Sequence, residues 1–457
     1  MTGQTWELAA LPGPRGHLDA VVRDLDDGLS CVLVFPDELV ERGTADELVQ
    51  VLGLRSCGVR VRPLSSRRVV VLETPHWESP ATTALPEWAR DTFGPIEFDD
   101  VPHVSPAAVD RPEETVVDRL CEAFRISEEG DPLVQLVTGD HMTGKVIVLC
   151  GWDGWDSADL GACVGRFTAL VKEHGIPPAE RPRLLMVVRE DDVPTSVQER
   201  VDQVTTRVHW WWDVYGRLDT ATVAAEVRRG SPWQTSKGRV TTLREHVAAE
   251  VLVEVAGPDL LLAEHLAQSW DGRVATLADQ VTALPHDTAD DLVPAEIAGR
   301  TGGARPPQAL RRAWRRGVVD RWDGRLRISP AAKVLTSNQV DLDTLVWRGQ
   351  SRALMPMVDG CRAHLEKVLR ARVSKSVVES LVQGHADEQR RRGRHRHGVV
   401  ELGAMAWSVS TRQVHLSQAD ADLLFRAWDI RNALAHLHPL SDDEIDRLAA
   451  VMPETLW

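Results

Sequence analysis

The sequence lacks features that would indicate several common classes of protein. Its 457 residues include six cysteines, with neither a C-x-x-C pair nor the spacing of zinc ligands. Cys31 and Cys150 lie in apolar runs, where a free thiol behaves as a small hydrophobic side chain, and this favours a reducing compartment. No run is long and apolar enough to cross a bilayer, and the N-terminus has no basic segment followed by an apolar stretch. We therefore expect a cytoplasmic protein with no membrane contact, no metal and no cofactor.

Two hydrolase signatures are also missing, because neither G-x-S-x-G nor H-E-x-x-H occurs. Aromatic residues are distributed unusually, with 16 tryptophans and one tyrosine. The densest group is Trp210-Trp211-Trp212, for which we favour packing over base stacking, because aromatic side chains mostly bury area.

Acidic residues outnumber basic ones, 68 to 53, and the chain contains one dense basic run, at 390–397. The net charge of −15 disfavours nucleic acid spread over the whole surface, so any such contact must be local. A solvated loop explains a basic run equally well. If the run binds RNA, it does so through phosphates and without sequence preference. The candidate RNA-binding residues are Arg390, Arg391, Arg392, Arg394 and Arg396.

The first 230 residues alternate helical stretches with β-rich runs at 31–35, 69–72, 146–149 and 184–188. Continuous aliphatic strands separated by helices predict a parallel sheet covered on both faces. The segment Gly139 to Lys145 fits G-x-x-x-x-G-K, but Val146 replaces the Mg²⁺-binding hydroxyl and a strand follows where a phosphate loop requires a helix. We interpret this segment as a turn between elements.

The order of these elements resembles the signalling ATPases of the STAND and AAA type. In those families the first strand leads into the phosphate loop, whereas here Phe35 leads into Pro36-Asp37-Glu38-Leu39-Val40-Glu41, which has no lysine. The acids that end a later strand are replaced by Cys150 and Gly151. The resemblance therefore implies a degenerate ATPase-like module, and its acidic loop would repel a triphosphate.

Residues 231–345 are expected to be mostly helical, followed by a hairpin. Asp323-Gly324 between alternating residues is a strong signal for a two-residue turn, and a helix from about Gln308 to Arg316 precedes it. Helix plus hairpin suggests a winged-helix element. Arg325 and Arg327 could contact DNA phosphates, although packing between neighbouring regions is the favoured interpretation.

The most informative motif lies near the C-terminus, at Arg431-Asn432-Ala433-Leu434-Ala435-His436. Apolar spacing from Leu423 onward, with a capping pattern at Ser417, predicts a helix that carries it. The spacing places Arg431 on the apolar stripe, where a charge needs a partner or a ligand. Asn432 and His436 are four residues apart and share one face. R-x4-H alone is weak, and an arginine paired with an acid beside a capping histidine would also explain it.

The segment resembles the R-N-x-L-A-H signature of the HEPN superfamily, on the third helix of a small four-helix bundle. The order of elements over about the last 110 residues fits: a long helix from about Trp347 to Arg372, the basic insert, a short helix with residues 399–403, the motif helix and a capped final helix begun by Ser441 and Glu444. The resemblance implies a homodimer with two motifs facing one cleft. It further implies that Arg431 binds the scissile phosphate, His436 transfers protons and Asn432 orients one of them.

Together the predictions describe a multi-domain α/β plus all-α protein. Its parts are an ATPase-like domain (1–230), a helical and winged-helix-like region (231–345) and a HEPN-like bundle (346–457). One hypothesis is a conditional, metal-independent endoribonuclease of toxin or phage-defence type. The other is a non-catalytic scaffold that binds a partner ATPase or another defence-system protein, as non-cleaving HEPN domains do.

Overall fold

The computed structural model describes residues 7–63, 115–127, 129–192, 204–229, 239–284, 303–331, 339–382 and 399–453. The chain divides into two compact units. One comprises residues 1–24, 33–55 and 208–457, and the other 25–32 and 56–207. The described parts of the middle region and of the C-terminal bundle therefore belong to the same unit.

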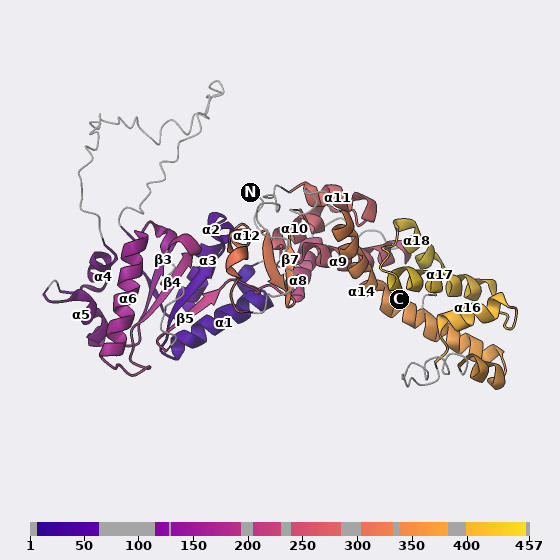
Figure 1. The fold of residues 1–457 in the computed structure, drawn as a ribbon, viewed down its shortest axis with the longest axis horizontal. Coiled ribbons are helices and arrows are strands. Elements are labelled where there is room, and N and C mark those ends of the chain that lie inside the picture. Colours follow the sequence, from indigo (N-terminus) through magenta and orange to yellow (C-terminus); the bar gives the residue numbers. More distant parts are fainter. Residues whose placement is uncertain are drawn as a thin grey trace, which may run out of the picture. The chain divides into compact units, whose positions relative to one another are not determined.

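A five-stranded parallel sheet confirms the predicted α/β region (Figure 1). Its order is β2-β3-β4-β1-β5. The strands are β1 (Ser30–Phe35), β2 (Val59–Arg60), β3 (Val146–Cys150), β4 (Arg183–Arg189) and β5 (Thr206–Trp210). All residues of β1 and β3 are buried, as expected for strands covered on both faces. The predicted strand at 69–72 lies outside the described residues, and β2 and β5 were not predicted.

The unit that contains β3 and β4 also contains α4 (Val116–Phe124), α5 (Pro132–Thr138) and α6 (Ser157–Glu173). Ile147 of β3 pairs with Leu184 of β4 in parallel register. The segment that fits G-x-x-x-x-G-K forms a 3-10 turn (Asp140–Met142) and leads directly into β3. This confirms the interpretation of a turn between elements, because no helix begins after Lys145 to present its amides to a phosphate.

The other unit begins with α1 (Pro12–Asp26), α2 (Asp37–Glu41) and α3 (Thr44–Arg55), and resumes with α8 (Arg217–Arg229), α9 (Arg239–Ala256), α10 (Leu260–Ser269) and α11 (Val274–Thr282). A short helix, α12 (Arg311–Arg315), precedes the hairpin of β6 (Val319–Trp322) and β7 (Arg325–Ile328). Asp323 and Gly324 both have positive φ, at 50° and 74°, as a type I′ turn requires. The predicted hairpin is confirmed.

The tryptophan triplet packs in the interior, as predicted. Trp210, Trp211 and Trp212 are 4%, 1% and 3% exposed. The Trp314 indole of α12 donates a hydrogen bond of 3.0 Å to the Trp211 carbonyl and is itself buried. These rings therefore join the end of β5 to the element that precedes the hairpin.

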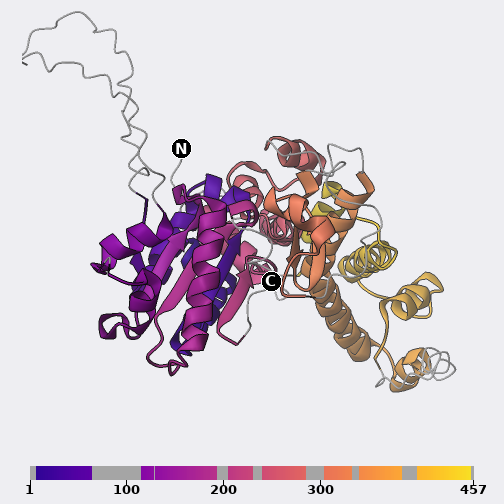
Figure 2. The ribbon, with the colours of Figure 1, turned by 60° about the vertical axis from the view of Figure 1, so that its left-hand side comes forward.

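The C-terminal helices are α14 (Gln339–Arg372), α16 (Leu402–Ser410), α17 (Gln418–Ala435) and α18 (Asp442–Val451). Figure 2 shows the yellow helices of this region beside the long orange helix α14. α17 contacts α14, α16 and α18, while α9 of the middle region contacts both α14 and α18. Two boundaries differ from prediction, since α14 begins at Gln339 and residues 399–401 precede α16. No helix in the described ranges is sufficiently long and apolar to span a membrane.

Candidate functional site

The motif occupies the last two turns of α17. The helix begins as predicted, with the Ser417 hydroxyl accepting a hydrogen bond of 3.1 Å from the Asp420 amide. It ends at Ala435, and His436 is the C-cap residue, its amide donating to the Asn432 carbonyl at 3.0 Å. This bond confirms the expected register of Asn432 and His436, one turn apart.

The predicted burial of Arg431 is wrong. The buried residues of α17 are Leu423, Leu424, Ala427, Ile430 and Leu434, whereas Arg431 is exposed. Arg431 lies about 60° around the helix from Leu434. At this end of the helix Leu434 is buried and Arg431 is exposed, so the guanidinium is accessible to solvent.

The functional groups of the motif are available at the surface. Arg431 Nη1 donates to Asn432 Oδ1 at 3.2 Å, which brings these two predicted site residues together. Arg431 forms no ion pair within the described ranges, and His436 is exposed without a side-chain hydrogen bond among the same residues. A guanidinium, an amide and an imidazole are thus presented on one helix end without an internal acid that would neutralise the cation.

Two side chains of α14 hold the backbone at Leu434, within the motif, and at Leu440, after it. The Trp347 indole donates to the Leu434 carbonyl at 2.7 Å, one of the last carbonyls of α17. The fully buried Gln350 accepts from the Leu440 amide at 2.6 Å and donates to the Leu440 carbonyl at 2.8 Å. We call these two side chains the α14 clamp. His436 lies between its two attachment points.

The residue that follows His436 is strained and exposed. Leu437 has φ of 63°, in the left-handed region that non-glycine residues rarely adopt, and 63% of its surface is accessible. Backbone strain of this kind persists where the surrounding structure enforces it, and it concentrates at functional sites.

Sequence reasoning missed the α14 clamp. A signal for Gln350 exists, because it falls at helical spacing among Val346, Leu354 and Val358, and a glutamine on a buried stripe must find partners. The basic insert, with Arg390, Arg391, Arg392, Arg394 and Arg396, lies outside the described residues.

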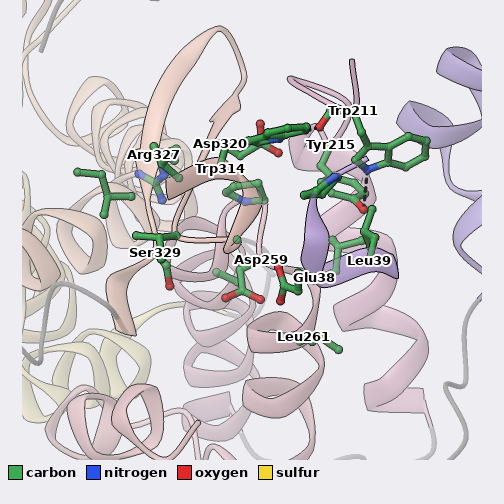
Figure 3. A pocket seen from close by; sticks show the side chains of 18 of the residues that line it. Glu38, Leu39, Trp211, Tyr215, Asp259, Leu261, Trp314, Asp320, Arg327 and Ser329 are labelled. Carbon is green, nitrogen blue, oxygen red and sulfur yellow. Dashed lines mark hydrogen bonds between the residues drawn. The ribbon is translucent and has the colours of Figure 1, made fainter. Parts of the chain in front are cut away.

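A second candidate site lies beyond the carboxyl ends of β1 and β5, where open α/β sheets commonly bind ligands. Both the segment after β1, from Pro36, and the segment after β5, from Trp211, line a cavity of about 80 Å³. Its aromatic wall is fixed, because Trp211 Nε1 donates to the Tyr215 hydroxyl at 3.0 Å (Figure 3). This is the place that a phosphate loop would occupy in the resemblance described above.

Acidic groups face this cavity. Glu38 of α2, Asp259 at the start of α10 and Asp320 of β6 all line it (Figure 3). Burial raises the pKa of Asp320 to about 7, and the charges of Asp213 and Glu38 add to the increase, although two backbone amides oppose it. Two arginines also line the cavity, but Arg42 pairs with Glu38 and Arg327 with Glu254. The acidic groups on the wall disfavour a triphosphate.

The hairpin arginines differ in their surroundings. Arg327 is 10% exposed and lies 3.5 Å from Glu254, so it is not available to a duplex phosphate. Arg325 is exposed. Arg327 therefore has a packing role. Of the two arginines named for DNA binding, Arg325 is the one that is exposed to a ligand.

No protein-family model, curated protein or solved structure matches the chain.

Proposed function

We propose that the C-terminal helices form a metal-independent endoribonuclease. The observation that carries the proposal is the exposed pair of Arg431 and His436 on one helix end, with no internal ion pair to Arg431 in the described part of the chain. Because Arg431 is exposed, its guanidinium is solvated and remains open to an anionic ligand such as a phosphate. The resemblance of the segment to the HEPN signature assigns the same residues to RNA cleavage.

The chemistry needs no oxidant, metal or external nucleophile. The ribose 2′-hydroxyl attacks the adjacent phosphorus, the P–O5′ bond breaks, and the products carry a 2′,3′-cyclic phosphate and a 5′-hydroxyl. Arg431 would bind the nonbridging oxygens in bidentate geometry and stabilise their developing charge. His436 would take the 2′ proton or protonate the leaving oxygen, because imidazole exchanges protons near neutral pH. Asn432, which already accepts from Arg431, would orient the guanidinium.

One motif supplies one guanidinium and one imidazole, whereas cleavage in one concerted step uses an acid and a base. A homodimer that brings two motifs to one cleft would supply both. The exposure of Arg431 and His436 leaves the motif open to such a second copy.

The N-terminal sheet region would regulate the nuclease without hydrolysing ATP. The loop after β1 forms α2, whose first turn carries Asp37 and Glu38, and it lacks the lysine that neutralises phosphates. In this proposal the region receives a signal or binds a partner protein, and the bundle cleaves RNA in the cytoplasm in response, as in toxin and phage-defence systems.

The test is incubation of the full chain with total cellular RNA in excess chelator, followed by analysis of fragment ends. We expect 2′,3′-cyclic phosphate ends with the wild type and none with the Arg431→Ala/His436→Ala variant. The matched control is Arg426→Ala/His415→Ala, which removes exposed residues of the same types from the same bundle and should cleave normally. Cleavage that survives the motif substitutions would contradict the proposal.

The alternative is a scaffold, in which the same surfaces bind an active ATPase or another defence-system subunit. The acidic cavity beyond β1 and the net charge of −15 favour it, because neither suits a nucleotide or an extended RNA. Absence of cleavage by a dimeric, folded wild type, together with co-purification of a partner that Arg431→Ala does not release, would favour the scaffold.

A further inference from the structure

Four arginines converge on one buried carboxylate, away from the motif. Glu254 of α9 has a side chain that is 4% exposed. Around it lie Arg217 of α8, Arg327 of β7, and Arg348 and Arg352 of α14. We call these four residues the arginine cluster.

Two of the four arginines donate hydrogen bonds to Glu254. Arg217 Nη1 donates to Glu254 Oε2 at 2.8 Å, and Arg327 donates to both the carboxylate and the backbone carbonyl of Glu254. Arg348 Nη1 and Arg352 Nε lie 3.9 and 3.6 Å from the carboxylate, beyond hydrogen-bonding distance. In the described portion of the chain neither of these two guanidiniums has a hydrogen-bond acceptor.

Positive charge is in excess at this place. Among the described residues, the acids that contact the cluster are Glu254, Glu250, which pairs with Arg217, and Asp323, which accepts from the Arg217 amide. In this part of the chain three carboxylates therefore face four guanidiniums, on a protein whose net charge is −15. Burial lowers the pKa of Arg327 to about 10, and the charges of Arg348 and Arg217 lower it further. The charge of Glu254 opposes this decrease.

The cluster is held in place yet remains accessible. The Trp322 ring lies 5.1 Å from the Arg327 guanidinium carbon and 5.9 Å from that of Arg217. Arg348 and Arg352 have side chains that are 37% and 54% exposed. Their like charges lie one helical turn apart, and the Glu254 carboxylate, 3.9 and 3.6 Å from them, offsets part of their repulsion.

We propose that the arginine cluster binds a small phosphorylated ligand with two or more negative charges, such as a diphosphate group. Guanidiniums bind phosphate oxygens in bidentate geometry, and Arg348 and Arg352 have the uncommitted donors to do so. Arg217 and Arg327 hold Glu254 behind them and maintain the positive potential. The cluster is compact and drawn from three elements, α8, β7 and α14, which suits a small ligand better than an extended polyanion. Arg327 also lines the cavity beyond β1 and β5, whereas Arg348 and Arg352 are not among its lining residues.

The experiment titrates the full chain with pyrophosphate at low ionic strength, measured by calorimetry, with each variant checked for folding by circular dichroism. We expect the Arg348→Gln/Arg352→Gln variant to lose affinity by about tenfold or more. Arg370→Gln is the matched control, because Arg370 lies on the same helix, is 48% exposed and pairs with Glu366. It should bind as the wild type does.

Should the double variant misfold, Arg352→Lys keeps the charge but loses the bidentate fork, and an intermediate loss is expected. Three results would overturn the proposal. The first is unchanged affinity in the folded double variant, and the second is no pyrophosphate binding by the folded wild type. The third is a single-stranded RNA that binds far more tightly than pyrophosphate and depends on the same two arginines, which would make the cluster part of an RNA path.

Discussion

Gln350 offers the sharpest test of how the motif is positioned. Its fully buried side chain bonds to both the amide and the carbonyl of Leu440, and leucine at position 350 has a similar volume but makes neither bond. Each buried backbone group left without a partner costs about 1–3 kcal/mol, so Gln350→Leu loses about 2–6 kcal/mol. The more apolar side chain recovers about 1–2 kcal/mol. We expect a net loss of about 3 kcal/mol.

That loss should be local, because it falls on the segment between α17 and α18. The assay is native-state hydrogen exchange, and about 3 kcal/mol corresponds to an increase of roughly a hundredfold in the exchange rate of the Leu440 amide if local opening limits it. The control is Gln418→Leu, because Gln418 is exposed and bonds only to Asp422, at 2.9 Å. RNA cleavage should also fall in Gln350→Leu, since the clamp holds the backbone that follows His436.

Equal exchange of Leu440 in the wild type and in Gln350→Leu would refute the clamp. Faster exchange with unchanged cleavage would retain the clamp but show that the position of the 437–440 segment does not limit the activity. The two measurements therefore separate the structural part of the argument from the functional part.

Three further predictions concern the same unit. Gly349→Ala should destabilise the protein by about 1–3 kcal/mol, because the new Cβ would lie 2.5 Å from the Val251 Cα; Gly403→Ala, whose nearest neighbour is at 3.6 Å, is the control for thermal unfolding. Asp320→Asn should be more stable than the wild type above pH 7, by about 3–4 kcal/mol, and should lose this advantage as the pH falls toward 4. The reason is that between pH 4 and 7 Asp320 is protonated in the folded wild type but ionised in the unfolded chain. An advantage that does not change with pH in urea unfolding would contradict this. The pKa of His17 is lowered to about 4 by burial and by His209. Because the unfolded chain binds the proton at a higher pH, the wild type should lose about 2–3 kcal/mol of stability as the pH falls from 6.5 to 4. In His17→Gln, the free energy of unfolding should depend less on pH over this range.

The parts of the fold that could be predicted are those whose signal is local. The runs at β1, β3 and β4 are continuous and aliphatic, so consecutive residues predict that each strand is buried on both faces. Asp323-Gly324 specifies its hairpin by backbone conformation alone. By contrast, β2 has only two residues, and β5 mixes polar and apolar ones, so neither strand stands out from its surroundings.

The residues of the motif could be predicted from the sequence, but the exposure of their side chains could not. Helical periodicity places Arg431 near the buried stripe, yet burial depends on which neighbours cover each turn, and those neighbours come from distant segments. The arginine cluster shows the same limit more strongly. Its arginines lie at positions 217, 327, 348 and 352, and no local sequence pattern predicts that they meet at Glu254.

One turn of α14 serves all of these features, and this constrains how the unit can work. Gly349 lets the backbones of α14 and α9 approach closely, Gln350 holds the end of the motif segment, and Arg348 and Arg352 reach Glu254 on α9. Pro356 removes the amide that would bond to the Arg352 carbonyl, so the helix is weakened just after this turn. A ligand at the cluster would therefore bind to the same turn of α14 that holds the motif segment.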